Sequence, residues 1–285
     1  MARLRQVVGV TSTTGDLLEV DDCNFSLSFE SVESSFVELL LQIERRLSRL
    51  MADSTASIAS GEVSPAEVVR TKPLQVSLVS RGVLFTALLE KALECDLREH
   101  CFENLALLQG ECKNTSAALC VELRSSDPGQ LERMKLSTNI VAEAHSADVA
   151  GTILDLARGF VGGSRGKLAN DLRWQVPVRF YQREAPFASG FVAPGRHRHA
   201  HRSAGAHRVV FGRAELNYGY ELISEAAPFY IAPLTYRCLL ACAAAVSSAS
   251  VVALGAPPGA GKSGSGKTEV AHPRVPMHAD VLDEI

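Results

Sequence analysis

The segment Leu254–Val270, LGAPPGAGKSGSGKTEV, contains two overlapping candidates for a phosphate-binding loop. In the pattern G-x-x-x-x-G-K-S/T, main-chain N–H groups surround the phosphates, the lysine neutralises the charge of the β- and γ-phosphates, and the hydroxyl ligates Mg²⁺. One candidate satisfies this pattern completely. The residues predicted to bind the nucleotide are Gly261, Gly264, Ser265, Gly266, Lys267 and Thr268, with Thr268 as the Mg²⁺ ligand.

The rival candidate, APPGAGKS, fits the pattern less well. It places Ala256 where the first glycine belongs, and its helix would begin on Ser263-Gly264-Ser265-Gly266. Each glycine in a first helical turn costs about 1 kcal/mol relative to alanine. We therefore assign the phosphate-binding role to Lys267 and treat Lys262 as an occupant of the loop.

The surroundings of the loop support a nucleotide site on the upstream side only. Ser250–Leu254, SVVAL, is suited to the buried strand that precedes such a loop. The uncharged run Cys238–Gly261 favours a buried helix followed by that strand over a membrane span. Downstream, Pro273 and Pro276 interrupt the helix that should follow, and a crossover to a parallel strand needs about a dozen residues or more. We expect a nucleotide fold that is begun here and not completed, which argues against a small complete P-loop kinase or NTPase.

The composition indicates a globular protein of one or two domains, with 285 residues, 46% hydrophobic and 21% charged. A net charge of −3 argues against nucleic acid as the partner, and no membrane partner is expected. Seven cysteines without a C-x-x-C pair indicate free thiols in a reducing compartment. Cys238 and Cys242 would be buried thiols on one helix face rather than metal ligands. Because the N-terminal residues lack the apolar core of a signal peptide, we expect a cytoplasmic protein.

Helical periodicity dominates the first half of the chain. Apolar residues recur at steps of three and four over residues 30–51, with Glu and Arg on the other side, which predicts an amphipathic helix. The Ser/Ala/Gly-rich residues 52–65 are interpreted as a loop or a weak helix end. Helical patterns resume over 84–126 and over 131–160, the latter as one helix or a pair, and the breaker SSDPGQ separates them. This order of elements shows no βαβ alternation.

The composition changes at residues 183–213, after the helical periodicity has ended. This stretch contains four of the eight histidines among arginines, prolines and glycines: His197, His199, His201 and His207. Because no carboxylate or cysteine ligand lies nearby in the sequence, a basic loop is favoured over a metal site. The next residues, HRVVFGRAELNYGYELI, alternate in polarity and predict a short hairpin.

Several of these stretches resemble the start of the first AAA+ module of dynein heavy chains. In that family Y-G-Y-E, I-T-P-L-T-D-R-C and G-A-P…G-K-T-E segments occur in order, as do LNYGYELI, FYIAPLTYRCLL and LGAPPGAGKSGSGKTEV here. Upstream segments are similar to successive parts of the dynein linker: FVELLLQIERRL, KPLQVSLVSRGVLFTALLEKALE, MKLSTNIVAEAHSADVAGTIL and DLRWQVPVRFYQ. The resemblance runs in one register from about residue 5 to Val270.

The resemblance implies a fragment of a dynein heavy chain, an ATP-driven, minus-end-directed microtubule motor. It implies a mainly α fold, the linker or lever, followed by the incomplete start of an α/β P-loop AAA+ module. The implied divisions are a linker-like helical region at 1–182, an Arg/His-rich loop at 183–213, the start of the ATPase module at 214–270 and a divergent tail at 271–285. The implied cofactors are ATP and Mg²⁺, with Pro233 and Leu234 against the adenine.

Partners and location follow from the same resemblance. The partners would be the rest of the dynein heavy chain and dynein intermediate and light chains, with microtubules contacted only through regions outside this chain. The location would be the cytoplasm and cytoskeleton, including the ciliary or flagellar axoneme. In that family the Walker B acid, the sensors and the arginine finger lie beyond residue 285, so no catalytic residue is assigned here.

Departures from the family pattern leave a second interpretation open. Phe85 stands where the family has tryptophan, and Tyr236 where it has aspartate. The chain would then be a non-catalytic helical interaction module of a motor complex, with a vestigial nucleotide loop. This alternative predicts that ATP leaves the thermal stability unchanged, whereas a nucleotide that binds the folded state raises it.

Overall fold

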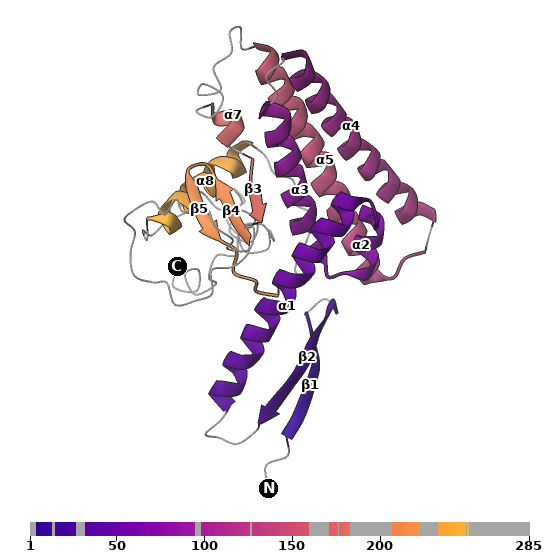
Figure 1. The fold of residues 1–285 in the computed structure, drawn as a ribbon, viewed down its shortest axis with the longest axis vertical. Coiled ribbons are helices and arrows are strands. Elements are labelled where there is room, and N and C mark those ends of the chain that lie inside the picture. Colours follow the sequence, from indigo (N-terminus) through magenta and orange to yellow (C-terminus); the bar gives the residue numbers. More distant parts are fainter. Residues whose placement is uncertain are drawn as a thin grey trace, which may run out of the picture.

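The computed structural model describes residues 4–12, 15–26, 32–94, 98–125, 127–159, 171–175, 177–182, 207–222, 233–248 and 250. Its helices are α1 (Val32–Ser60), α2 (Pro65–Thr71), α3 (Leu74–Glu94), α4 (Arg98–Ser125), α5 (Gln130–Gly159), α7 (Leu172–Gln175) and α8 (Pro233–Ser247). Its strands are β1 (Leu4–Thr11), β2 (Leu17–Ser26), β3 (Arg179–Gln182), β4 (His207–Phe211) and β5 (Ala214–Asn217). The mainly α prediction is confirmed for these residues, with two small antiparallel sheets added (Figure 1). The phosphate loop of the predicted AAA+ module lies outside them.

Three long helices, α3, α4 and α5, form the body of the molecule and lie side by side (Figure 1). Apolar side chains at helical spacing are buried between them, among them Leu89, Leu105 and Ile153. The Gln109 side chain of α4 lies against Gly151 of α5, where a Cβ would be 2.5 Å from Gln109 Nε2. The residues predicted as one helix or a pair over 131–160 form the single helix α5.

Helix α1 continues further than the sequence predicts. The residues interpreted as a loop or weak helix end, 52–65, remain helical as far as Ser60. Thr55 is buried, and its hydroxyl donates to the Met51 carbonyl at 2.7 Å. Burial against neighbouring helices therefore outweighs the weak helix propensity of this Ser/Ala-rich stretch.

The apolar stripe of α1 is covered only along part of its length. Ile43 and Leu47 are buried in the main core. Phe36 and Leu40 lie on the same stripe nearer the N-terminus of the helix, yet 52% and 61% of their surface is exposed. The periodicity predicted the stripe correctly, and the position of neighbouring elements decides which part of it is buried.

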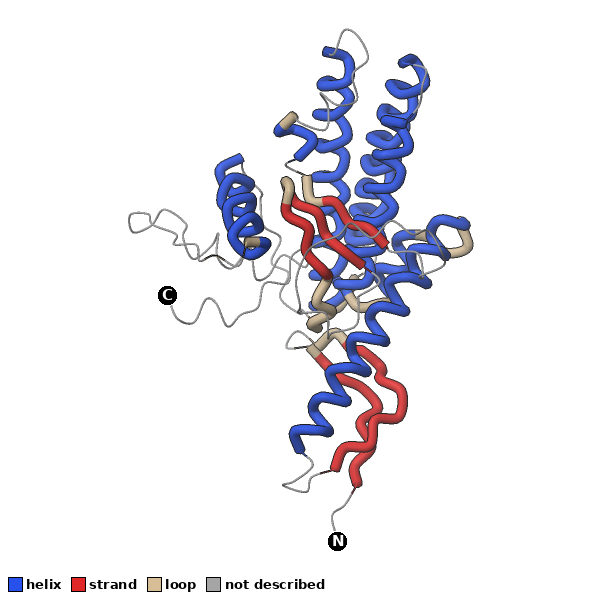
Figure 2. The backbone as a smooth tube through the Cα atoms, turned by 60° about the vertical axis from the view of Figure 1, so that its left-hand side comes forward, coloured by secondary structure: helices blue, strands red, loops and turns tan. Residues whose placement is uncertain are grey.

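The N-terminal residues form a hairpin that the sequence analysis did not predict. β1 and β2 pair antiparallel and lie alongside α1 (Figure 2). In β2, Leu18 and Val20 are buried and alternate with the exposed Leu17 and Glu19. The buried pair joins the core that contains Ile43 of α1. The hairpin therefore depends on the apolar stripe of α1 for its inner face.

A second sheet has the strand order β3-β4-β5, with both pairs antiparallel. The hairpin predicted from HRVVFGRAELNYGYELI is confirmed as β4 and β5, joined by a tight turn in which Gly212 has φ +60°. Strand β3 pairs with β4, so one sheet contains residues from both sides of the predicted divisions at 182 and 213. The division of the chain into 1–182, 183–213, 214–270 and 271–285 stays a prediction.

A row of buried polar residues joins α5 to its neighbours. Its members are four apart on one face of α5: Lys135, Asn139 and Glu143. Lys135 Nζ lies 3.3 Å from Asp16 Oδ1 in the turn between β1 and β2. Asn139 Nδ2 donates to Ser77 Oγ at 3.1 Å. The Arg81 guanidinium donates twice to the Glu143 carboxylate, at 2.6 and 3.0 Å. These bonds fix the position of α5 along α3, because a shift along the helix axis would leave the groups unpaired.

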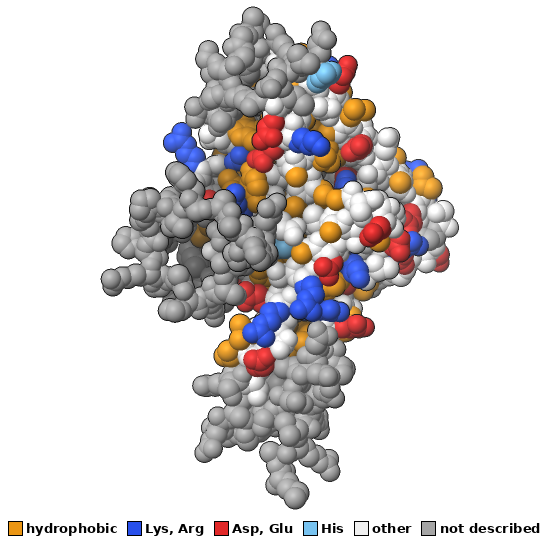
Figure 3. Space-filling model, viewed as in Figure 1, with side chains coloured by type: hydrophobic (Ala, Val, Ile, Leu, Met, Phe, Trp, Pro, Cys, Tyr) orange, Lys and Arg blue, Asp and Glu red, His pale blue; other side chains and the backbone are white. Residues whose placement is uncertain are grey.

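Charged side chains of both signs are interspersed over the described helices on the face drawn in Figure 3. Some form surface ion pairs, such as Arg70–Glu122 at 3.2 Å and Arg208–Glu215 at 2.8 Å. Exposed pairs of this kind contribute little to stability, about 0–1 kcal/mol each. Within the part of the chain that the structure describes, no helix has the length and apolar character to cross a membrane.

Candidate functional site

The predicted nucleotide-binding residues lie mainly outside the described part of the chain. This applies to Gly261, Gly264, Ser265, Gly266, Lys267 and Thr268, and to all of the predicted strand at 250–254 except Ser250. Pro233 and Leu234, predicted against the adenine, are the first two residues of α8. Proline is favoured at a first helical position, where its missing N–H would have no partner. The structure therefore describes the approach to the loop, which is α8.

Helix α8 packs on the β4–β5 hairpin. Ala243 of α8 is fully buried with Phe211 and Ala214 of the hairpin. Leu240 lies so close to the hairpin turn that a Cβ on Gly212 would be 2.7 Å from its Cδ2 atom. The predicted helix at the start of the uncharged run is thus present. Its Cys238 and Cys242 are free thiols, and Cys242 is buried.

The sheet is attached to the helical body through β3. Phe180 is buried, and a Cβ on Gly82 of α3 would lie only 2.7 Å from its ring. The Phe180 N–H donates to Thr86 Oγ1 at 3.0 Å, and Thr86 Oγ1 donates to the Gly82 carbonyl at 2.8 Å. Tyr181 donates its hydroxyl proton to Glu90 at 2.5 Å. Burial, with this bond to Glu90, raises the pKa of Tyr181 to about 12, so the hydroxyl keeps its proton.

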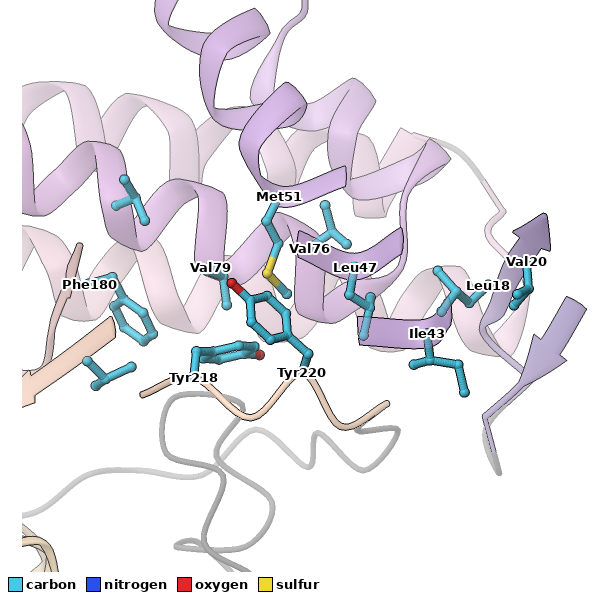
Figure 4. Close-up of a cluster of buried hydrophobic side chains, with 12 residues drawn as sticks. Leu18, Val20, Ile43, Leu47, Met51, Val76, Val79, Phe180, Tyr218 and Tyr220 are labelled. Atoms are coloured by element: carbon cyan, nitrogen blue, oxygen red, sulfur yellow. The ribbon is translucent and has the colours of Figure 1, made fainter. Parts of the chain in front are cut away.

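Two tyrosines that follow β5 are buried in the main core, as Figure 4 shows. Tyr218 and Tyr220 pack edge to face, with ring centroids 5.1 Å apart. The Tyr218 hydroxyl accepts a hydrogen bond from Gln75 Nε2 of α3 at 2.5 Å. The Tyr220 hydroxyl lies 2.9 Å from the main-chain N of His207 and 2.7 Å from its Nδ1 atom. We call residues 218–220 the tyrosine junction.

Sequence reasoning used the tyrosine junction only as a family pattern and did not predict its burial. The sequence pattern places His207 with the histidines of the Arg/His-rich stretch. It is instead the fully buried first residue of β4. The available signal was the alternation HRVVF, which places His207, Val209 and Phe211 on one face of a strand.

Acidification should weaken the fold through His207. Burial lowers the pKa of its imidazole from 6.5 to about 4, because the charged form loses its hydration. The His207 imidazole is therefore protonated near pH 6.5 in the unfolded state, but only near pH 4 in the folded state. Stability from this group is fully present above pH 6.5 and falls as the pH drops towards 4, by about 3 kcal/mol in total.

Urea unfolding at pH 7.0 and at pH 4.5 would measure this loss. Carboxylates also titrate at low pH, so His207→Phe serves as the control for them. The pH dependence of the variant should be clearly smaller than that of the native chain. Equal pH dependence in the two proteins would show that His207 does not supply the effect.

The polar side chains named above make hydrogen bonds between helices and strands of the fold. Burial, with the nearby Glu143 carboxylate, raises the pKa of the Cys112 thiol to about 12, so this thiol is not activated as a nucleophile. Within the described residues, no three histidine, cysteine or carboxylate side chains are grouped to hold a metal ion. What the described residues build is a continuous packed connection from α8, through the sheet and the tyrosine junction, to α3.

The sequence of the chain was compared with protein-family models and with curated proteins. No family model matches the chain. Two curated proteins do, dynein axonemal heavy chain 1 of Mus musculus and of Rattus norvegicus, each 27% identical over 247 residues. The chain is similar to a segment of dynein heavy chains. The match covers 85% of this chain and 5% of each relative, so the chain spans about a twentieth of the length of the dyneins it matches.

Wherever the dynein match begins and ends, it includes the packed connection from α3 as far as Cys242 of α8. A span of 85% of 285 residues leaves only about 43 residues uncovered, so it contains residues 44–242. Helices α3 to α5, the sheet and the tyrosine junction all fall within that range. The resemblance to dynein heavy chains that the motifs predicted is confirmed.

Proposed function

We propose that this chain is a piece of a dynein heavy chain, an ATP-driven, minus-end-directed microtubule motor. The observation that carries the proposal is the dynein similarity over 85% of the chain. In this proposal residues 1–182 belong to the linker, which acts as the lever, and residues 214–270 begin the main ATP-hydrolysing AAA+ module. The Arg/His-rich stretch 183–213 lies between them and ends in strand β4 (His207–Phe211), and residues 271–285 form a divergent tail.

The packing of α8 supports a mechanical role. The proposed phosphate loop follows α8 closely in the chain, and Leu240 of α8 packs on the hairpin at Gly212. The sheet continues through β3, whose Phe180 is packed against α3 at Gly82. Close-packed elements transmit displacement because their contacts cannot be compressed. A shift of α8 during ATP turnover would therefore reach the helical body through the sheet.

ATP and Mg²⁺ are the proposed cofactors, and the donor set of the loop suits them. Gly261, Gly264, Ser265 and Gly266 would supply main-chain N–H groups to the phosphates. Lys267 would neutralise phosphate charge, and the Thr268 hydroxyl would ligate Mg²⁺. Pro233 and Leu234 would lie against the adenine. Mg²⁺ would draw charge from the transferring phosphoryl group, and the residues of this chain would hold and orient the nucleotide.

Lys267→Ala should weaken MgATP binding at least about tenfold, because the phosphates lose their neutralising ammonium group. Isothermal titration of the chain with MgATP would measure this. Lys262→Ala is the matched control, since Lys262 lies five residues away in the same loop and should leave the affinity unchanged. Equal losses from both changes would contradict the assignment of Lys267. If MgATP leaves the melting temperature of the native chain unchanged, the chain does not bind nucleotide by itself.

The proposed assembly is a dynein complex. This chain would act together with the rest of the heavy chain and with intermediate and light chains, and microtubules would be contacted by other parts of the motor. The axonemal relatives favour a cytoskeletal location, in a cilium or flagellum.

A further inference from the structure

The backbone of Tyr220 has an unusual conformation. Its φ is 53°, and among the described residues other than glycine it alone has a positive φ. A side chain with a Cβ is disfavoured in this left-handed region because the Cβ approaches the following carbonyl oxygen. Only 2% of the Tyr220 surface is exposed. The buried surroundings therefore hold this residue in a strained conformation.

The Tyr220 hydroxyl makes two contacts with one residue. It accepts a hydrogen bond from the main-chain N–H of His207 at 2.9 Å and lies 2.7 Å from His207 Nδ1. A tyrosine hydroxyl has one proton, and donating it to Nδ1 completes both bonds. His207 then carries its own proton on Nε2.

The Nε2 atom of His207 is buried and has no hydrogen-bond partner within the described structure. A buried polar group without a partner costs free energy, because it has lost the water that would satisfy it. Two contributions that are unfavourable in free energy therefore occur at one contact: the left-handed backbone of Tyr220 and the unpaired Nε2 of His207. Both would be relieved if Tyr220 and His207 separated.

The contact between Tyr220 and His207 lies where the helical body meets the three-stranded sheet. Tyr220 lies in the core with Met51 of α1 and Val76 of α3, whereas His207 begins β4. The β4–β5 hairpin in turn packs against α8. The pair therefore links the helical body to the sheet that α8 packs against.

We propose that Tyr220 and His207 form a latch between the helical body and the sheet. In the closed state described here, the Tyr220 hydroxyl is hydrogen-bonded to the main-chain N–H and to the Nδ1 atom of His207. In the open state Tyr220 returns to a right-handed or extended backbone, and His207 Nε2 gains a partner in water. The latch opens at lower free energy than the bundle of α3, α4 and α5 unfolds. What its opening would serve rests on the proposed function, in which α8 and the helical body move relative to each other.

Hydrogen exchange of the 285-residue chain tests the latch. Tyr220→Phe keeps the ring and removes both bonds to His207, so the His207 amide should exchange at least about tenfold faster. Amides of α5 should keep their protection. Tyr218→Phe is the matched control, because it keeps a ring in the same core and removes the hydroxyl that accepts from Gln75. In that variant the His207 amide should stay protected.

Two results would overturn the latch. One is that both variants speed exchange equally throughout α3 to α5, because that would be general destabilisation. The other is that Tyr220→Phe leaves exchange over residues 207–222 unchanged. Nitrogen-15 NMR of the native chain at pH 7 gives a separate test that needs no variant. The Nε2–H tautomer of His207 is expected, and an Nδ1–H tautomer would contradict the hydroxyl's role as donor. None of these measurements uses nucleotide, so their outcome is independent of the Lys267→Ala test.

Discussion

Asp16→Ala is expected to lower the free energy of unfolding by about 3–5 kcal/mol. The Asp16 carboxylate has two buried partners. Its Oδ1 atom lies 3.3 Å from Lys135 Nζ, and its Oδ2 atom accepts a hydrogen bond from the Leu74 N–H at 2.6 Å. The Asp16 and Lys135 side chains are 9% and 7% exposed. The change would leave a buried ammonium group without a counter-charge and the first N–H of α3 without an acceptor.

Two further variants separate these effects in urea unfolding experiments. Asp16→Asn keeps an acceptor for Leu74 and removes only the charge, so it should cost less than Asp16→Ala. Ser64→Ala removes an acceptor at the N-terminus of another helix, α2, where the exposed Ser64 Oγ accepts from the Glu67 N–H at 3.2 Å. This change should cost about 1 kcal/mol. If Asp16→Ala costs no more than Ser64→Ala, Asp16 acts as an ordinary helix cap and the buried ion pair contributes nothing.

Glu143→Leu is also expected to cost about 3–5 kcal/mol, for a related reason. Arg81 and Glu143 form a bidentate pair between α3 and α5, with side chains 19% and 7% exposed. Removing the carboxylate leaves a guanidinium group largely out of water and without its hydrogen-bonded counter-charge. Denaturant unfolding monitored by circular dichroism would measure the loss.

The double variant Arg81→Met with Glu143→Leu provides the control. A buried ion pair that is replaced by apolar side chains of similar volume often costs little, because the desolvation of both charges is removed together. The double variant should therefore be more stable than Glu143→Leu alone, which gives a coupling energy between the two positions. Additive losses would mean that the two side chains contribute independently through packing.

Local order in this chain was predictable from the sequence because it depends on residues that are close in the chain. The apolar periodicity of residues 30–51 predicted most of α1, and the alternation of polarity over residues 207–223 predicted the β4–β5 hairpin. The pattern ending in Lys267 and Thr268 predicts a phosphate loop, and this prediction remains to be tested. The motifs also predicted the similarity to dynein heavy chains, since order and spacing of segments are properties of the sequence itself.

The N-terminal hairpin was missed because its stabilisation is not local. In the sequence the alternation that includes Leu18 and Val20 is short. Their burial depends on the stripe of α1 that contains Ile43. Isolated two-stranded hairpins are marginal in water, so a strand pair of this kind forms where another element covers one face.

Helical periodicity in the sequence predicted most of α1, the later part of α3, α4 and α5, and the sequence also predicted the helix α8, the β4–β5 hairpin and a motif that points to a nucleotide. Which polar groups pair became visible in the tertiary structure alone. Asp16 and Lys135 are 119 residues apart in the chain, and Gln75 and Tyr218 are 143 apart. At such separations nothing in the local pattern selects a partner. Most buried polar groups nevertheless have a partner, because burial without a hydrogen bond or counter-charge is unfavourable by an amount that is large relative to the net stability of a fold. The packing of the helices therefore determined which groups pair.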